Sequence, residues 1–318
     1  MIKKSRITAV ALTGGLGNQL FQLAAGLSAT KKGMLYIDWG LGKPRISESG
    51  LPEIASFNLP KNATLDLTVL KNKFASKVFG YMLRQGINQR IYEKIPTFKI
   101  MSSIIASFLI SVCLKKFFWV YVSNDVGYSE LPEYSNRKLL IGYFQSYIWA
   151  KESGTYDYFR TLQIANECDE IVYYKNLAEI EKPLIVHIRL GDYKDEKNFG
   201  IPVPAYYAKA ISQLWSSGEY LKIWIFSDEP SLALKIYGEI LPANCRWIPE
   251  IANSAAKTLE VMRYGNGYVI ANSTFSWWGA FLSHKSNPPV IAPSPWFKST
   301  DSPSHICPPH WGLIPGWE

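Results

Sequence analysis

The 318-residue sequence lacks the short motifs that mark several common enzyme classes. It has no GxxxxGK[ST] stretch, so it is not a P-loop enzyme, and it has no GxSxG or HExxH stretch. No Asp-x-Asp pair occurs, so the sequence lacks the pair of carboxylates that usually binds the divalent ion of a nucleotide diphosphate. We therefore expect neither a metal ion nor a resident cofactor.

Cysteine is scarce, and no basic cluster stands out. The four cysteines lie far apart and form no CxxC pair, which excludes the usual zinc sites and a disulfide scaffold and fits a reducing compartment. The net charge of +8 favours an anionic partner. The basic residues are scattered, however, so we expect no nucleic acid.

Long apolar runs are also lacking. The most apolar window, residues 104–122, is interrupted by Lys115 and Lys116, and its uncharged part is short for a membrane span. We predict a buried helix followed by a strand there, with a peripheral membrane contact as the alternative. The first residues lead straight into a glycine turn and are typical of a strand rather than a signal peptide. We expect a cytoplasmic protein, at most peripheral to the inner face of the membrane.

Apolar strands alternate with amphipathic helices along most of the chain. This alternation predicts an α/β fold with parallel sheets, and the length favours two Rossmann-like domains, residues 1–160 and 161–318. Residues 39–98 are less regular. We predict strands at residues 7–12, 34–38, 139–144, 184–189, 222–227, 245–249, 268–273 and 289–293, and helices near residues 20–27, 206–215, 231–240, 255–263 and 274–284.

The stretch "HIRLGDY" follows the strand that begins at residue 184. His187 and Arg189 alternate with apolar residues and so share one face at the end of the strand. An arginine there can clamp a phosphate with two parallel hydrogen bonds. The alternative is a structural Arg189–Asp192 pair that orients the loop.

Two further strand ends carry polar side chains. "FSDEP" offers Ser227 and Asp228, and a carboxylate there could accept from a guanine edge or a ribose hydroxyl, or cap the next helix. "NSTFSWW" places Ser273 and Thr274 at a helix start, where they can cap the helix, bind a phosphate, or do both. Ligands of open α/β sheets bind beyond the carboxyl ends of the strands, so we expect these groups to lie together.

A glycine-rich turn, "GGLGNQLFQLAAG", follows the first strand. It fails the dinucleotide fingerprint, because the third glycine position falls on Leu20. Gly17 and its neighbouring glycines would let the backbone approach a ligand closely. Asn18 at the helix start could hydrogen-bond a sugar near the reacting carbon, or cap the helix.

Together these motifs resemble glycosyltransferase family 11, the α-1,2-fucosyltransferases, in its bacterial form. The matching stretches are "GGLGNQLFQLAAG", "HIRLGDY", "FSDEP" and "ANSTFSWWGAFL", which occur in the family's order and span most of the chain. The resemblance implies a GT-B fold with two Rossmann-like domains facing a cleft. The donor would be GDP-fucose, bound by the C-terminal domain, and the N-terminal domain would hold the acceptor.

The resemblance also implies a reaction and a site. Fucose would pass with inversion to the 2-hydroxyl of a galactoside acceptor glycan, in the synthesis of a surface polysaccharide. Arg189 would face the donor diphosphate beside His187, and the same pocket would be lined by Asn272, Ser273, Thr274 and Ser276. One of the family's two consecutive arginines is replaced here by Leu190, and Thr258 stands where many members have an acidic residue.

Three readings of the function remain open from the sequence. The first is the galactoside α-1,2-fucosyltransferase, with Asp192 or His187 as the candidate general base. The second is another GDP-sugar transferase with a different linkage, since donor motifs say little about acceptors. The third is a catalytically silent protein that binds GDP or a glycan on the same fold.

Overall fold

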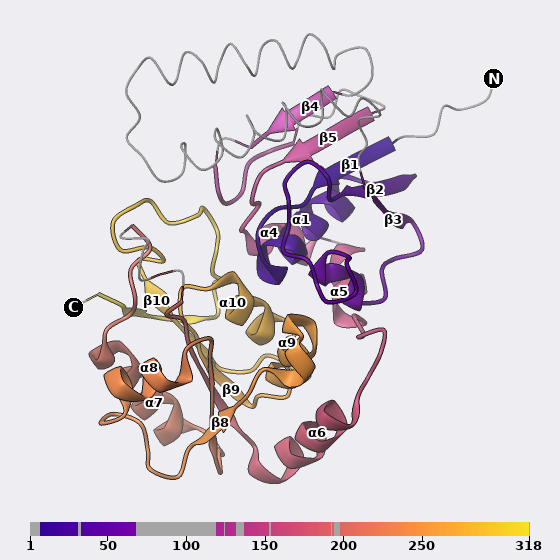
Figure 1. The fold of residues 1–318 in the computed structure, drawn as a ribbon. Helices are drawn as coiled ribbons and strands as arrows, with labels where there is room; N and C mark the ends of the chain where they lie inside the picture. Colours follow the sequence, from indigo (N-terminus) through magenta and orange to yellow (C-terminus); the bar gives the residue numbers. More distant parts are fainter. Residues whose placement is uncertain are drawn as a thin grey trace, which may run out of the picture. The chain divides into compact units, whose positions relative to one another are not determined.

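A computed structural model describes residues 7–30, 33–67, 119–123, 125–131, 137–152, 154–191, 193 and 198–317 of the chain. The chain divides into two compact units (Figure 1). Unit 1 comprises Met1–Gln163 and Pro303–Ile306, and unit 2 comprises Ile164–Ser302 and Cys307–Glu318. The predicted division lay at residue 160. The sequence did not indicate that Pro303–Ile306, near the C-terminus, belong to unit 1.

Unit 1 is built on a five-stranded parallel sheet with the order β3-β2-β1-β5-β4. The central strand is β1, whose neighbours are β2 on one side and β5 on the other. The strands are β1 (Ile7–Ala11), β2 (Met34–Asp38), β3 (Ala63–Asp66), β4 (Trp119–Val122) and β5 (Arg137–Ile141).

Helix α1 (Leu16–Ala29) packs on this sheet against β1 and β2. Leu20, Leu23 and Ala24 are fully buried, as the i, i+3, i+4 spacing of its apolar residues predicts. The remaining helices that the structure describes in unit 1 are the 3-10 turn η1 (Glu53–Ser56), α4 (Tyr147–Lys151) and α5 (Thr155–Arg160).

Unit 2 contains a six-stranded parallel sheet with the order β11-β10-β9-β6-β7-β8. Counted from β6 as the first strand, this is the 3-2-1-4-5-6 order of the doubly wound dinucleotide-binding fold. The winding direction reverses between β6 and β9. The strands are β6 (Leu184–Ile188), β7 (Ile223–Ser227), β8 (Arg246–Ile248), β9 (Gly267–Val269), β10 (Val290–Ser294) and β11 (Gly312–Pro315).

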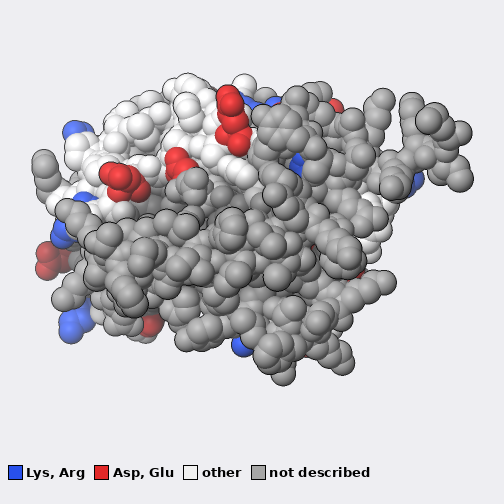
Figure 2. Space-filling view, turned by 90° about the horizontal axis from the view of Figure 1, so that it is seen from above, with Lys and Arg blue, Asp and Glu red and all other residues white. Residues whose placement is uncertain are grey.

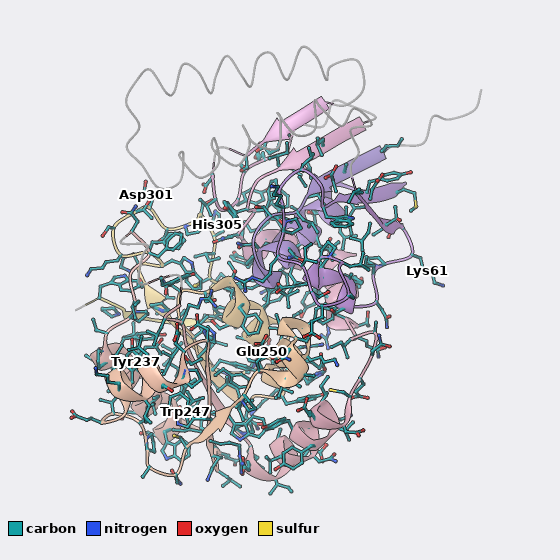
Figure 3. The ribbon with its side chains drawn as sticks, viewed as in Figure 1. Lys61, Tyr237, Trp247, Glu250, Asp301 and His305 are labelled. Carbon is teal, nitrogen blue, oxygen red and sulfur yellow. The ribbon has the colours of Figure 1, made fainter. Side chains whose placement is uncertain are left out.

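Helices cover both faces of the unit 2 sheet. On one face, α7 (Pro204–Ser217) and α8 (Pro230–Tyr237) enclose a core that includes Val186, Ile225 and Tyr237 (Figure 3). Trp224 alternates with the core residues, and its indole donates to Glu181 on the opposite face. Glu181 is the last residue of α6 (Asp169–Glu181), and α6 contacts α9 (Ala255–Met262). Helix α9 also packs against α10 (Thr274–Phe281). The 3-10 turn η3 (Ile251–Asn253) precedes α9.

The structure differs from the sequence prediction in several elements. Helix α6 was not predicted because it buries only Ile171 and Ala178, while Val172 and Ile180 are exposed, so its apolar residues mark no single face. Strands β3 and β11 were also missed. β9 ends at Val269 rather than at residue 273, and α10 ends at Phe281 rather than at residue 284. The helix predicted within residues 104–118 lies outside the described residues.

Basic side chains are dispersed on the face of the molecule that Figure 2 shows. Figure 2 shows one face of the molecule, on which the Lys and Arg side chains of the described residues lie apart from one another. Within the described part of the chain, no helix has the length and apolar character that crossing a membrane requires.

Candidate functional site

The carboxyl ends of β6, β7 and β9 meet at one place in unit 2. Arg189 lies just beyond β6 and forms an ion pair with Asp228, which lies just beyond β7. The His187 ring on β6 contacts the ring of Phe275 at the start of α10, with centroids 5.9 Å apart. The three polar strand ends that the sequence singled out therefore come together. They do so where the winding direction of the sheet reverses, which is the crevice in which doubly wound sheets bind ligands.

The Arg189 guanidinium is held by a carboxylate and an aromatic ring. Its Nη1 lies 3.1 Å from Asp228 Oδ2, and its central carbon lies 5.7 Å from the centre of the Tyr193 ring. The side chain keeps about a fifth of its surface exposed. Arg189 is thus both oriented by its neighbours and accessible to an anion.

Asp228 orients the loop after β6 and does not cap α8. Its Oδ1 accepts a hydrogen bond from the Leu190 backbone N–H at 2.9 Å while Oδ2 faces Arg189. The N-cap of α8 is Glu229, so the predicted capping role of Asp228 is wrong. A side chain at Gly191 would come within 2.4 Å of Asp228 Oδ2, which explains why glycine suits this position.

His187 is buried on the face of β6 that α10 covers. Burial lowers the pKa of His187 to about 3; the Asp228 carboxylate opposes this shift and Arg189 adds to it. His187 is therefore neutral near pH 7. Its Nδ1 is buried and meets no hydrogen-bond partner among the described residues. A neutral imidazole can orient a ligand, but it is a weak proton acceptor at this pKa.

The start of α10 has the geometry that suits an anion. Ser273 is the N-cap, and its Oγ accepts from the Phe275 backbone N–H at 3.3 Å, so its capping role is confirmed. Thr274 is the first helical residue and is partly exposed. The first N–H groups of a helix and the positive end of its dipole attract phosphate, so the second predicted role stays available to both residues.

Asn272 and Ser276 are more enclosed than the sequence suggested. Asn272 Nδ2 donates to the Phe199 carbonyl at 3.0 Å and so fixes the loop that precedes α7, while its buried Oδ1 accepts nothing from the described residues. Ser276 is fully buried, and its hydroxyl donates to the Ser273 carbonyl. We therefore assign Ser276 to packing and leave it out of the proposed donor site.

Three other positions that the sequence singled out, Ser227, Asp192 and Thr258, have different outcomes. Ser227 Oγ accepts from the Glu229 N–H at 3.1 Å and so shapes the turn after β7. Asp192 lies outside the described residues, so the predicted pairing with Arg189 and its role as a base stay predictions. Thr258 donates to the Ser254 carbonyl and accepts from the Ile251 N–H, which makes it a structural residue of α9.

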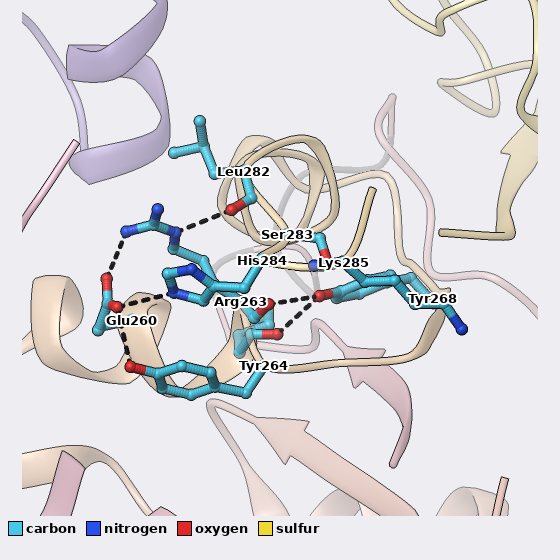
Figure 4. Close-up of polar contacts among 9 residues, drawn as sticks. Glu260, Arg263, Tyr264, Tyr268, Leu282, Ser283, His284 and Lys285 are labelled. Atoms are coloured by element: carbon cyan, nitrogen blue, oxygen red, sulfur yellow. Dashed lines mark hydrogen bonds and ion pairs between the residues drawn. The ribbon is translucent and has the colours of Figure 1, made fainter. Parts of the chain in front are cut away.

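The carboxylate nearest to Thr258 on α9 is committed to a buried network. Glu260 forms ion pairs with Arg263 and His284 and accepts from the Tyr264 hydroxyl (Figure 4). Arg263 also donates to the Leu282 carbonyl at the end of α10. The network joins α9 to α10. Because Glu260 is held in this network, we assign its carboxylate no contact with the guanine of a donor nucleotide.

In unit 1, the glycine turn after β1 lies against the side chain of Asn18. Gly14 has φ of +72°, and a side chain there would approach Asn18 Nδ2 within 2.5 Å, so the position admits only glycine. The N-cap of α1 is Gly15, with no side-chain cap. The predicted alternative in which Asn18 caps the helix is therefore wrong. Gly17 is buried in the first turn of α1.

The two glutamines of this motif hold the turn together. Gln19 donates to the Gly14 carbonyl and accepts from the Ile54 N–H. Gln22 accepts from the Thr13 N–H at 2.9 Å and donates to the Gly142 carbonyl at 3.1 Å, which joins the ends of β1 and β5. Both side chains are fully buried. Gln19 and Gln22 are therefore structural, whereas the neighbouring Asn18 stays partly exposed.

We expect Gln22→Glu to lower the free energy of unfolding by about 2 kcal/mol at neutral pH. The introduced carboxylate could still accept from Thr13 but would face the Gly142 carbonyl without a proton to donate. The loss should shrink at acid pH, where the carboxyl group is protonated and can donate again. Urea unfolding at pH 7 and pH 5 measures it, with Gln213→Glu on the exposed face of α7 as the control. Equal loss at both pH values would contradict this account.

Two residues near the turn carried no local signal in the sequence. Gln145 follows β5 and donates through Nε2 to Asn18 Oδ1 at 3.1 Å. Glu53 is a buried carboxylate with Oε2 3.8 Å from the position that a side chain at Gly15 would occupy. Each is brought to the turn by a segment distant in sequence. Only a long-range contact could have revealed them.

Among the described residues, no group of three or more His, Cys, Asp or Glu side chains is placed to hold a metal ion. At the switch point of unit 2, the Arg189 guanidinium and the start of α10 are groups that could bind a phosphate.

Two Rossmann-like units, one of which gathers Arg189, Asp228 and a helix start at its switch point, are the architecture of a glycosyltransferase of the GT-B class. The sequence profile of glycosyl transferase family 11 matches residues 86–309, and the chain belongs to this family. It is 27% identical over 319 residues to the alpha-1,2-colitosyltransferase of Escherichia coli, covering 97% of this chain and 99% of that protein. It is 26% identical over 309 residues to the O-antigen biosynthesis glycosyltransferase WbnK of Escherichia coli, covering 90% and 93%.

Solved structures agree in fold. The fucosyltransferase NodZ from Bradyrhizobium matches with a TM-score of 0.51 at 15% identity, covering 95% of this chain and 98% of that chain. A crystal structure of NodZ alpha-1,6-fucosyltransferase soaked with GDP-fucose matches with a TM-score of 0.50 over the same shares. At this identity the likeness concerns the fold. The predicted fold class, α/β of the GT-B type, is confirmed.

Proposed function

We propose that this glycosyltransferase moves fucose, with inversion, from GDP-fucose to the 2-hydroxyl of a terminal galactoside. The observation that carries the proposal is the meeting of Arg189, Asp228 and the start of α10 at the switch point of unit 2. Such an arrangement suits a diphosphate, and the chain belongs to family 11. The alpha-1,2 linkage named for the Escherichia coli relative supports the choice of the 2-hydroxyl, and the name of WbnK supports a surface glycan as the product.

The proposed reaction is a single in-line displacement. The acceptor hydroxyl attacks the anomeric carbon as GDP departs on the opposite face, and negative charge grows on the β-phosphate. Arg189 and the N–H groups at Ser273 and Thr274 stabilise that charge, because they are fixed before the reaction begins. Asp228 keeps the guanidinium in place throughout.

A general base must take the proton of the acceptor hydroxyl. The low pKa of His187 and its burial make it unsuitable, so its role is to border the donor. Asp192 remains the candidate that the sequence supplies. Asp192→Asn should lower the rate of transfer and leave the affinity for GDP unchanged, whereas weakened GDP binding would assign Asp192 to the loop.

A second donor is favoured by one observation. The relative that matches 97% of this chain is a colitosyltransferase, and colitose is fucose without its 3-hydroxyl. The same switch-point groups would bind either donor, because both carry the same diphosphate in their GDP-linked forms. The choice depends on contacts to the sugar and not on Arg189.

One assay separates these functions. Purified protein is incubated with GDP-fucose or GDP-colitose and a panel of β-galactosides, and the linkage of each product is determined by NMR. We expect an α-1,2-fucosyl galactoside. A different linkage or donor would replace the proposed specificity. GDP binding without transfer to any acceptor or to water would indicate a catalytically silent binding protein.

We expect transfer to proceed at its full rate in EDTA. The proposed site neutralises the leaving diphosphate with Arg189 and a helix start, so no divalent ion is needed. Initial rates with EDTA, and with Mg²⁺ or Mn²⁺ added back, measure this. A rate that falls in EDTA and returns with either ion would contradict the proposed leaving-group stabilisation.

A further inference from the structure

Gln145 lies beyond the carboxyl end of β5, next to the central strand of the unit 1 sheet. β1 and β5 are neighbouring parallel strands in this sheet. The glycine turn follows β1, and the turn that contains Gln145 follows β5. Ligands of open α/β sheets bind beyond the carboxyl ends of the strands, so the turns after β1 and β5 are a candidate place for a ligand of unit 1.

The side chain of Gln145 is nine-tenths buried and only half satisfied. Its Nε2 donates to Asn18 Oδ1 at 3.1 Å, whereas its buried Oε1 accepts no hydrogen bond from the described residues. A buried acceptor without a partner destabilises a fold, and such groups are rare without a reason. Replacement by an apolar side chain would remove this destabilisation, so the amide points to a ligand.

The contact also fixes which way the Asn18 amide faces. Because Asn18 Oδ1 accepts from Gln145, the Nδ2 group of Asn18 is left as the donor of this partly exposed side chain. The pair therefore combines a donor, Asn18 Nδ2, with an acceptor, Gln145 Oε1. Sugars present hydroxyl groups on adjacent carbons, and such groups match a neighbouring donor and acceptor.

The backbone around Gln145 is held on both sides. Phe144 has φ of +54°, a left-handed conformation that only a well-fixed turn maintains for a phenylalanine. The Gln145 N–H donates to the Val126 carbonyl at 2.7 Å. The next residue, Ser146, donates through Oγ to the carbonyl of His305, from the segment that returns to unit 1. The amide is therefore positioned before any ligand arrives.

We propose that Gln145 and Asn18 form a sugar-hydroxyl site in unit 1, in which Gln145 Oε1 accepts a substrate hydroxyl and Gln145 Nε2 positions the Asn18 amide. The inference rests on the proposed fucosyl transfer for the identity of the sugars. The hydroxyl belongs either to the transferred sugar or to the galactoside acceptor, and the two sources are distinguished by experiment.

The test uses Gln145→Leu and Gln145→Glu. Leucine removes both contacts, while glutamate keeps an acceptor oxygen but cannot donate to Asn18. Both should lower kcat/KM for transfer roughly 10- to 100-fold, with the affinity for GDP unchanged. Gln145→Leu should melt at or above the wild-type temperature, because it removes an unsatisfied buried acceptor. A fall in melting temperature that accounts for the lost activity would make Gln145 merely structural and overturn the proposal.

Substrates that lack one hydroxyl identify the partner of Oε1. On the substrate that lacks the hydroxyl bound by Gln145 Oε1, the wild type and Gln145→Leu should transfer at similar rates. GDP-colitose tests the transferred sugar, and 3-, 4- and 6-deoxygalactosides test the acceptor. If Gln145→Leu keeps wild-type kcat/KM on the full substrates, or if no deoxy substrate narrows the difference, the hydroxyl contact is refuted.

Two controls separate this inference from the proposed function. Gln213→Leu, the same change on the exposed face of α7, should leave transfer unchanged. Binding of methyl β-galactoside and methyl α-fucoside is followed by ligand-observed NMR, which needs no reaction. If the wild type transfers no fucose, the proposed function fails. The site then stands only if Gln145→Leu weakens binding of one of these glycosides.

Discussion

Arg189→Lys is expected to lower kcat/KM for GDP-fucose about 100- to 1000-fold, nearly as far as Arg189→Ala. The positive charge survives this change, but the planar guanidinium does not. In the structure Nη1 faces Asp228 Oδ2 at 3.1 Å, and the side chain keeps a fifth of its surface exposed. A guanidinium has five N–H donors in a fixed plane, so it can hold a carboxylate and bind phosphate oxygens at once, whereas an ammonium group is a single point.

The control for Arg189→Lys is the same change at Arg246. Arg246 is also ion-paired, to Glu181, and it begins β8 at the amino end of the sheet, away from the switch point. Arg246→Lys should leave kcat/KM unchanged. Steady-state kinetics with both variants measure the contrast. Near-wild-type turnover of Arg189→Lys would remove Arg189 from the stabilisation of the leaving diphosphate.

The sequence was most informative where strands are buried on both faces. β6 reads as an unbroken apolar run apart from His187, so both the strand and the odd residue in it could be recognised. The rule that ligands bind at carboxyl ends then selected Arg189 and the start of α10 without any knowledge of the strand order. Parallel pairing makes this possible, since every strand ends at the same edge.

The partner of Arg189 could not be chosen from the sequence. Asp192 is the near carboxylate along the chain, yet the ion pair with a described residue joins Arg189 to Asp228, 39 positions away. Asp228 also stands close to the start of a helix, where an aspartate is often a cap, but Pro230 occupies the first helical position, so Glu229 is the N-cap and Asp228 lies two residues before the helix. Local capping rules and tertiary pairing compete for the same carboxylate, and the local pattern cannot decide between them.

In the proposed site of unit 1, the partner of a motif residue was still harder to predict from the sequence. The motif "GGLGNQ" indicated a close backbone approach, and the left-handed Gly14 beside Asn18 agrees with that. The partner of Asn18 is Gln145, 127 positions further on, in a stretch with no motif of its own. Its importance follows from burial and an unmet hydrogen bond, which are properties of the folded chain only.

Arg263→Met is expected to lower the free energy of unfolding of unit 2 by about 3–5 kcal/mol. The Arg263 side chain is 3% exposed and its partner Glu260 is 8% exposed, at an N–O distance of 2.5 Å. Removal of the arginine leaves a buried carboxylate whose remaining partners among the described residues are the partly exposed His284 and the Tyr264 hydroxyl (Figure 4). The bond from Arg263 to the Leu282 carbonyl is lost too, so α9 and α10 separate more easily.

Thermal unfolding provides the measurement, with a melting temperature that falls by roughly 10 °C. Arg246→Met is the control, because Arg246 is also ion-paired to a glutamate, Glu181, while a third of its side chain is exposed. Exposed pairs contribute about 0–1 kcal/mol, so this variant should melt within a few degrees of the wild type. If both variants melted alike, burial of the Glu260–Arg263 pair would not be what stabilises the contact between α9 and α10.

The pH dependence gives a second test of the same network. Burial disfavours the charged form of Glu260, but the hydrogen bond from His284 and the charge of Arg263 outweigh it, so the pKa of Glu260 lies below its ordinary value of 4.5. A lowered pKa in the folded state means that the unfolded chain binds the proton more readily. The stabilisation is therefore complete above pH 4.5 and is lost as the pH falls through the folded value. In Arg263→Met that pKa should rise, so the variant's stability should begin to fall at a higher pH than that of the wild type.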